Sequence, residues 1–141
     1  MITANGEFII PPAQRQILRE QAEALGQDYD QIVNAAIEQA KVQGGKMIVE
    51  GGVQAVVGYE GGCYVKPCII EAKNEYNAVQ TETFAPILYL IKYSGDVHDA
   101  LELQNGVQQG LSSAIMTSDM REAHIFLSES GSDCGIANVN I

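Results

Sequence analysis

Apolar runs alternate with amphipathic stretches along the second half of the chain. Residues 85–93 form an almost unbroken apolar run, too short to span a membrane, which predicts a strand buried on both faces as in a parallel sheet. Residues 111–117 predict another buried strand, and residues 135–141 a last one. Helical patterns lie between these strands. The order strand, helix, strand, helix, strand favours an α/β fold with a mostly parallel sheet, flanking helices and right-handed crossovers.

The two helices of this half have recognisable starts and inward faces. Ser94 or Asp96 can begin the first, which Gly106 or Gly110 stops. Asp119 and Glu122 have the spacing of a capping box at the start of the second, which Gly131 ends. The expected inward-facing residues are Val97, Ala100 and Leu101 in the first helix and Ala123, Phe126 and Leu127 in the second.

The first half predicts a helix followed by short strands. Asp28 or Asp30 can cap the helix, and Gly44-Gly45 ends it. Its apolar stripe repeats at i, i+3, i+4 and i+7, namely Val33, Ala36, Ile37 and Ala40. Residues 46–50 and 63–71 predict strands. Pro67 lies inside the second, which places that strand at a sheet edge or at a bulge.

The start and the end of the chain are unusual. Residues 1–29 carry a possible helix with Leu18, Ala22 and Leu25 on one face, and we treat them as an N-terminal extension. Residues 30–141 contain the regular pattern. The last predicted strand reaches the final residue, which suggests a truncated chain.

Length and charge restrict the function. The chain has 141 residues, enough for one domain with a modest core, and a formal net charge of −10. This charge argues against nucleic acid and anionic membranes as partners. No apolar run is long enough for a membrane helix, and the N-terminus lacks the pattern of a secretory signal. We therefore expect a cytoplasmic protein.

Few residues point to chemistry by themselves. The three cysteines, Cys63, Cys68 and Cys134, predict free thiols in a reducing compartment, and none is expected to be catalytic. His98 and His124 fall on predicted surface helices. We expect no metal site. The glycines match neither a dinucleotide fingerprint nor a phosphate loop, and predict turns.

Four stretches, taken together and in order, resemble the aldehyde dehydrogenase superfamily. They are Gly62-Cys63-Tyr64-Val65-Lys66-Pro67, Glu82-Thr83-Phe84-Ala85-Pro86-Ile87, the segment from Asn105 to Thr117, and Ser132-Asp133-Cys134-Gly135-Ile136-Ala137-Asn138-Val139-Asn140-Ile141. The last is similar to the antiquitin-like branch, whose members oxidise α-aminoadipic semialdehyde. The resemblance covers residues 30–141 and implies the later portion of the catalytic domain.

The resemblance implies a cofactor and two residues that contact it. Glu82 would accept hydrogen bonds from the nicotinamide ribose of NAD, Phe84 would pack beside the nicotinamide ring, and Pro86 would fix the turn that follows. Asn140 lies near the substrate end of the last strand. The family's nucleophilic cysteine in a G-Q-x-C segment and its general base in an E-L-G-G segment are absent from this sequence.

The sequence therefore leaves three hypotheses open. The first is an aldehyde dehydrogenase fragment without catalytic activity of its own, with weak or no NAD binding. The second is a non-enzymatic α/β module that self-associates into a homo-oligomer. The third is one half of a split enzyme, completed by a partner chain that supplies the missing N-terminal aldehyde dehydrogenase portion.

Overall fold

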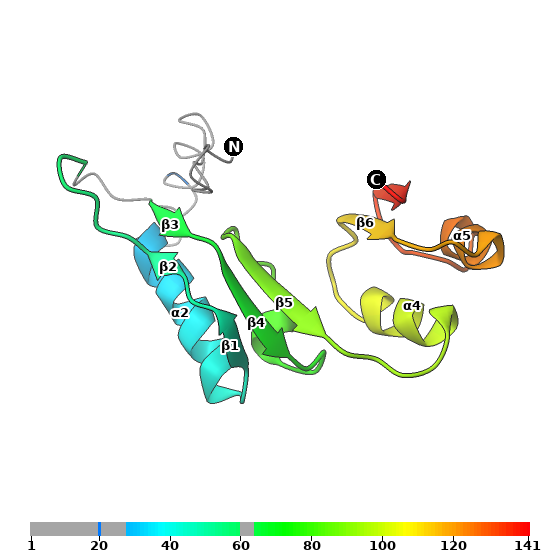
Figure 1. The fold of residues 1–141 in the computed structure, drawn as a ribbon, viewed down its shortest axis with the longest axis horizontal. Helices are drawn as coiled ribbons and strands as arrows, with labels where there is room; N and C mark the ends of the chain where they lie inside the picture. The colour runs from blue at the N-terminus through cyan, green and yellow to red at the C-terminus, as the bar shows by residue number, and fades with distance from the viewer. Residues whose placement is uncertain (1–19, 21–27, 60–63) are drawn as a thin grey trace. The chain divides into compact units, whose positions relative to one another are not determined.

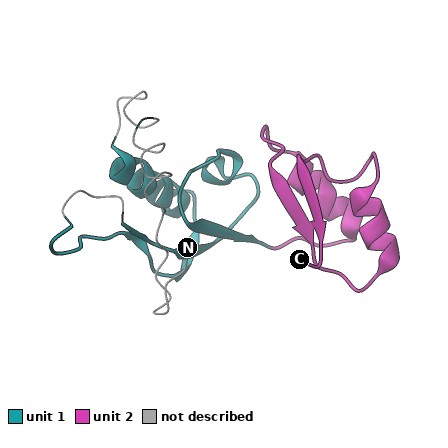
Figure 2. Cartoon of the chain, turned by 90° about the horizontal axis from the view of Figure 1, so that it is seen from above, with its two compact units in different colours: residues 1–91 teal, residues 92–141 magenta. Residues whose placement is uncertain are grey.

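The computed structural model describes residue 20, residues 28–59 and residues 64–141 (Figure 1). The predicted helix around residues 18–25, apart from residue 20, and Cys63 lie outside these residues. The chain divides into two compact units, residues 1–91 and residues 92–141 (Figure 2). No helix in the described part is long and apolar enough to cross a membrane.

The first unit combines a long helix, a short helix and two small sheets. Its elements are α2 (Tyr29–Val42), β1 (Lys46–Val49), β2 (Gly52–Val53), β3 (Val65–Lys66), β4 (Cys68–Ala72), α3 (Asn77–Gln80) and β5 (Ile87–Ile91). The main sheet has the order β1-β4-β5, in which β1 is antiparallel and β5 parallel to the central strand β4. β2 and β3 pair antiparallel.

Helix α2 begins and ends where the sequence predicts. The Asp28 carboxylate accepts a hydrogen bond from the Asp30 amide and caps the first turn. At the other end, Gly44 has a φ of 101° and its amide donates to Lys41, while the Gly45 amide donates to Ala40. This is a Schellman ending, and the positive φ explains why a glycine occupies position 44.

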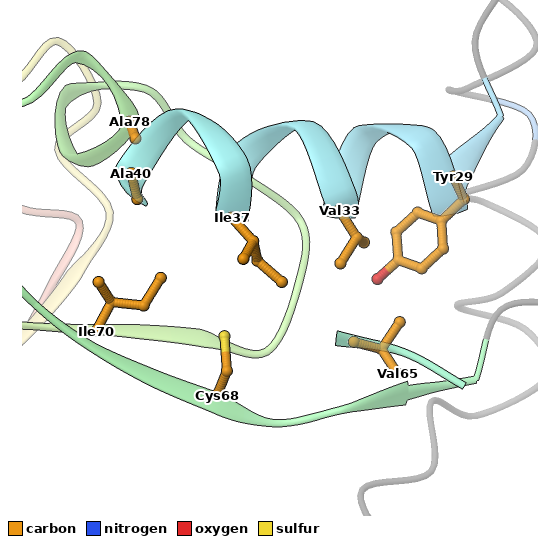
Figure 3. Close-up of a cluster of buried hydrophobic side chains, with 8 residues drawn as sticks. All are labelled: Tyr29, Val33, Ile37, Ala40, Val65, Cys68, Ile70 and Ala78. Carbon is orange, nitrogen blue, oxygen red and sulfur yellow. The ribbon is translucent and has the colours of Figure 1, made fainter. Parts of the chain in front are cut away.

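The predicted apolar stripe of α2 forms the core of this unit. Val33, Ala36, Ile37 and Ala40 are all buried, as predicted, and Tyr29 extends the stripe by one turn. Figure 3 shows Val33, Ile37 and Ala40 facing the strands that carry Cys68, Ile70 and Val65. Ala78 of α3 completes this cluster. Burial of these side chains holds the helix on the sheet.

Pro67 acts differently from the prediction. It lies neither at an edge nor at a bulge of one strand, but divides the predicted strand into β3 and β4. A proline has no amide hydrogen for the ladder, so pairing changes partner at this point. β3 pairs with β2, whereas β4 becomes the central strand of the main sheet.

The prediction that residues 85–93 are buried on both faces is wrong for this chain. In β5, Ile87, Tyr89 and Ile91 are half-buried, whereas Leu88 and Leu90 are exposed. Register places Leu88 beside Ile69 of β4, and Ile69 beside Val49 of β1. These apolar residues form the open sheet face: Val49, Ile69, Leu88 and Leu90. Within this unit, α2 and α3 pack on the opposite face of the sheet, in the cluster that includes Cys68 and Ile70.

The second unit has the predicted strand–helix–strand order. Its elements are α4 (Val97–Asn105), β6 (Ser112–Ile115), α5 (Met120–Leu127) and β7 (Ile136–Val139). β6 and β7 pair in parallel with α5 between them in sequence. The sequence predicted one sheet from residue 85 onward, but β5 belongs to the sheet of the first unit. β6 is not a fully buried strand either, since its exposed and half-buried residues alternate.

Most inward-facing residues of this unit were predicted correctly. Val97 and Leu101 of α4 and Phe126 of α5 are buried together, with Ile115, Ile125 and Val139 packed against them. Leu127 was predicted to face the core but is 57% exposed. Ile125, and not Leu127, packs against the buried cluster from α5. The architecture of both units is α/β, as predicted.

Candidate functional site

The candidate site is the loop of residues 81–86, between α3 and β5, which we call the cofactor loop after the role that the sequence resemblance implies. Glu82 and Phe84 both lie in it, directly before the strand, as the sequence predicted. Both side chains are exposed, and the Phe84 ring remains 56% accessible. A large apolar ring held outside the core at a loop is available for contact with a ligand.

The backbone of the cofactor loop is tightly folded. The Ala85 amide donates to the Thr83 carbonyl and the Ile87 amide to the Ala85 carbonyl, each at 2.8 Å. These two successive three-residue turns bring the chain into β5. The Cys68 amide of β4 donates to the Pro86 carbonyl at 3.1 Å, which ties the end of the loop to the sheet.

One side chain reaches the middle of the loop from far away in sequence. The hydroxyl of Tyr29, in the first turn of α2, donates to the Phe84 carbonyl at 2.8 Å. Tyr29 is only 3% exposed, and its hydrogen bond to the loop is partly buried. This contact could not be predicted from the sequence, because 55 residues separate the two groups.

Glu82 fits the role that the resemblance implies. Within the described residues, no hydrogen bond or ion pair occupies its carboxylate. A carboxylate offers two acceptor oxygens, which match two adjacent hydroxyl donors such as those of a ribose. The exposed Phe84 ring lies two residues further along the same loop.

The described cysteines lie in opposite environments. Cys68 is buried in the core of the first unit, where burial, with a smaller contribution from the Glu50 carboxylate, raises the pKa of its thiol. Hydrogen bonds from Ser113, and then from Ser132, hold the pKa of the Cys134 thiol below its usual range. Both cysteines are free thiols, as predicted.

Cys134 ends a chain of hydrogen bonds that the sequence did not indicate. The Gln104 side-chain amide donates to the Ser132 hydroxyl, Ser132 lies 2.7 Å from the Ser113 hydroxyl, and Ser113 donates to the Cys134 sulfur at 3.0 Å. Between Ser113 and Ser132 either hydroxyl can be the donor, because each has one proton and two acceptor lone pairs. No histidine or carboxylate takes part that could act as a base for the thiol.

Asn140 has a structural role in the second unit. Its side chain accepts a hydrogen bond from the Thr117 amide and donates one to the Thr117 carbonyl, both at 2.9 Å. With a φ of 59°, Asn140 turns the chain after β7 and fastens it to the residues that follow β6. This pairing occupies the polar atoms of the side chain.

The described histidines and acids do not form a metal-binding group. His98 and His124 are exposed on α4 and α5, as predicted. Among the described residues, no three histidine, cysteine, aspartate or glutamate side chains come together in a group that could hold a metal ion.

A family model matches most of the chain. The aldehyde dehydrogenase family model covers residues 21–141, which include the cofactor loop and both sheets with parallel strands. The resemblance seen in the four sequence stretches is thereby confirmed.

Curated relatives belong to the branch that the last stretch indicated. The chain is 43% identical over 107 residues to α-aminoadipic semialdehyde dehydrogenase of Bos taurus, covering 75% of this chain and 19% of that protein. It is 46% identical over 105 residues to aldehyde dehydrogenase family 7 member A1 of Pisum sativum, covering 74% of this chain and 20% of that protein.

Solved structures agree with the fold. PnpE in complex with nicotinamide adenine dinucleotide superposes with a TM-score of 0.66 at 27% identity, covering 79% of this chain and 22% of PnpE; PnpE comes from Pseudomonas sp. WBC-3. The chain therefore spans about a fifth of the length of the proteins it matches. Motifs, fold and family match agree, and the chain belongs to the aldehyde dehydrogenase family.

Proposed function

We propose that this chain is the later portion of the catalytic domain of an NAD-dependent aldehyde dehydrogenase. The domain boundary lies near residue 30, and the cofactor loop supplies one corner of the NAD site. The observation that carries the proposal is the loop itself: an unoccupied carboxylate at Glu82 and an exposed ring at Phe84 stand together before β5. A structure with bound nicotinamide adenine dinucleotide is among those that match the chain.

Each loop residue has a defined task in this proposal. NAD supplies the hydride acceptor for oxidation of the aldehyde. The Glu82 carboxylate accepts hydrogen bonds from the two hydroxyls of the nicotinamide ribose, and the Phe84 ring limits where the nicotinamide can lie. Both contacts position the cofactor and neither breaks a bond, so they act through orientation.

The parent reaction converts an aldehyde to a carboxylate through a cysteine thioester. Its nucleophile and general base are not among this chain's residues: G-Q-x-C and E-L-G-G segments do not occur. Cys68 is buried with a raised pKa, and in the part of the chain that the structure describes the side chains hydrogen-bonded to Cys134 are serines, which are not bases. We therefore propose that the chain alone has no dehydrogenase activity and binds NAD weakly or not at all.

A hybrid enzyme tests this function. The residues of this chain that align with the pea relative replace the corresponding segment of that relative. The hybrid is assayed for NAD reduction with α-aminoadipic semialdehyde, the aldehyde named for the bovine relative. We expect turnover by the hybrid and none by the purified chain. A folded hybrid without turnover, or turnover by the purified chain, contradicts the proposal.

A second candidate function is assembly, either with further copies of the chain or with a partner that carries the missing portion. The open sheet face favours it, because Leu88 and Leu90 lie exposed on a strand whose other face is packed. Light scattering across a concentration series distinguishes the two. Concentration-dependent dimers or larger oligomers support self-association, whereas a monomer that co-purifies with an N-terminal aldehyde dehydrogenase piece supports a split enzyme.

A further inference from the structure

We propose that Tyr29 is a positioning residue for the cofactor loop, acting through the Phe84 carbonyl. The inference rests on the proposed function only in assigning NAD to the loop. The anchor itself is a property of the first unit, since Tyr29, Cys68 and the loop all lie within it.

The start of α2 fixes the direction of the Tyr29 side chain. Asp28 is the N-cap, with its carboxylate on the Asp30 amide, and its carbonyl accepts the first helical hydrogen bond from Ile32 at 3.1 Å. Tyr29 is therefore the first helical residue. Its ring lies beside Val33 and above Val65 in the core (Figure 3). A ring packed on these sides has one orientation available to its hydroxyl.

The Tyr29 hydroxyl binds the loop at a carbonyl for which the structure gives no backbone donor. Thr83 and Ala85 carbonyls are taken by the two tight turns, and the Pro86 carbonyl by the Cys68 amide. The Phe84 carbonyl lies between these groups, and Tyr29 is its donor. Without that donor, the Phe84 carbonyl has no hydrogen-bond partner. The peptide that carries the Phe84 ring is then free to move.

The effect is directed at the ligand side of the loop. The Phe84 carbonyl faces inward to Tyr29, so its ring, on the same residue, projects to the exposed side. Holding the carbonyl consequently fixes the ring and, two residues earlier, Glu82. Tyr29 touches neither the cofactor nor the substrate, and its role is to position residues that do.

Tyr89 offers a matched control. It lies in the same unit, is packed against the same core cluster, and its hydroxyl has no hydrogen-bond partner within the described residues. Tyr29→Phe and Tyr89→Phe each remove one buried hydroxyl and keep the ring. Only the first removes a contact with the loop.

Amide hydrogen exchange on the full chain tests the Tyr29–Phe84 hydrogen bond and needs no NAD. In Tyr29→Phe we expect exchange at the hydrogen-bonded amides of Ala85 and Ile87 to rise roughly fivefold, the factor that loss of one ordinary hydrogen bond gives, with α2 and the residues of β4 after Cys68 unchanged. Tyr89→Phe should leave these amides unchanged. No rise in the loop, or an equal rise throughout the first unit, overturns the inference.

The hybrid enzyme then separates the anchor from the proposed function. There Tyr29→Phe should raise KM for NAD severalfold with little change in the KM for the aldehyde, and Tyr89→Phe should change neither. An unchanged KM for NAD in an active hybrid overturns the positioning role. A hybrid that does not use NAD at all defeats the proposed function instead, and the exchange result still decides whether Tyr29 anchors the loop.

Discussion

At the scale of single residues, the two described cysteines show how strongly position decides reactivity. Cys68 is among the most buried side chains of the first unit, and burial favours its neutral thiol. Cys134 receives a hydrogen bond from Ser113 that favours its thiolate. The attacking species toward an alkylating reagent is the thiolate, so the two residues should differ both in access and in charge state.

We expect iodoacetamide to modify Cys134 before Cys68 in the native chain. Because its pKa is lowered, the reaction of Cys134 should reach half its maximal rate at a lower pH than that of an ordinary cysteine. Cys68, with a raised pKa and a buried sulfur, should react only at higher pH or on unfolding. Mass spectrometry of each cysteine-containing peptide over a pH series measures both.

Ser113→Ala is the variant that isolates the cause. It removes the donor to the sulfur and should move the Cys134 alkylation curve to higher pH, whereas Ser112→Ala, at an exposed neighbour, should leave the curve in place. A curve that is identical in all three proteins would show that the Ser113 hydroxyl does not tune this thiol.

The sequence could not reveal this cluster. Gln104 lies near the end of α4, Ser113 lies in β6, and Ser132 and Cys134 lie in the loop before β7. No spacing rule connects them, because only the folding of the second unit brings them together. Glu82 and Phe84 could be identified because both lie in one short motif, and Tyr29 could not because its partner is far away in sequence.

At the scale of elements, helix starts were easier to predict than their hydrogen bonds. Asp119 was predicted to form a capping box with Glu122, but Glu122 instead accepts a hydrogen bond from the Thr117 hydroxyl, and the Asp119 amide donates to the same hydroxyl. Asp119 still caps α5 through the Arg121 amide. A threonine two residues before the cap therefore displaced half of the predicted motif.

The complete capping box lies at the start of α4. The Asp96 carboxylate accepts from the His98 amide at 2.8 Å, and the Asp99 carboxylate accepts from the Asp96 amide at 2.8 Å. Two amides that the helix leaves unpaired are thus satisfied.

We expect Asp96→Ala to lower the free energy of unfolding of the second unit by about 1 kcal/mol, the usual cost of an N-cap. Asp96→Asn keeps an acceptor oxygen and should cost much less. Urea unfolding followed by circular dichroism measures the difference. Equal losses in the two variants would show that charge, and not the capping oxygen, stabilises the start of α4.

Strand burial was the least predictable property at this scale. The apolar stripe of α2 was predicted in full because a helix repeats its inward face every three to four residues. An unbroken apolar run such as residues 85–93 has no alternation of apolar and polar positions that would mark one face as exposed. Which of its faces is covered depends on what packs there, and in this chain only one face of β5 is packed.

At the scale of the whole molecule, the open sheet face is an apolar surface of a chain that matches only part of its relatives. The chain spans about a fifth of the length of its relatives, and Leu88 is 54% exposed in a run of the kind that is normally covered. An apolar sheet face left in water favours association.

Leu88→Lys should weaken whatever association light scattering detects. Leu127→Lys is the matched control, because Leu127 is similarly exposed, at 57%, but lies on α5 of the other unit. We expect a loss of oligomer only for the first variant. The same loss in both, or in neither, would show that the open sheet face is not the contact surface.

The central claim is that the loop before β5 is a working part of an NAD site. The most direct measurement compares the KM for NAD of the hybrid enzyme with that of its Glu82→Gln variant. Glu102→Gln on α4 is the control for loss of one negative charge. Removing a charged acceptor should raise KM for NAD, or lower kcat/KM, roughly 10- to 100-fold. The control should be unaffected. If Glu82→Gln behaves like Glu102→Gln, the loop does not bind the cofactor and the account is wrong.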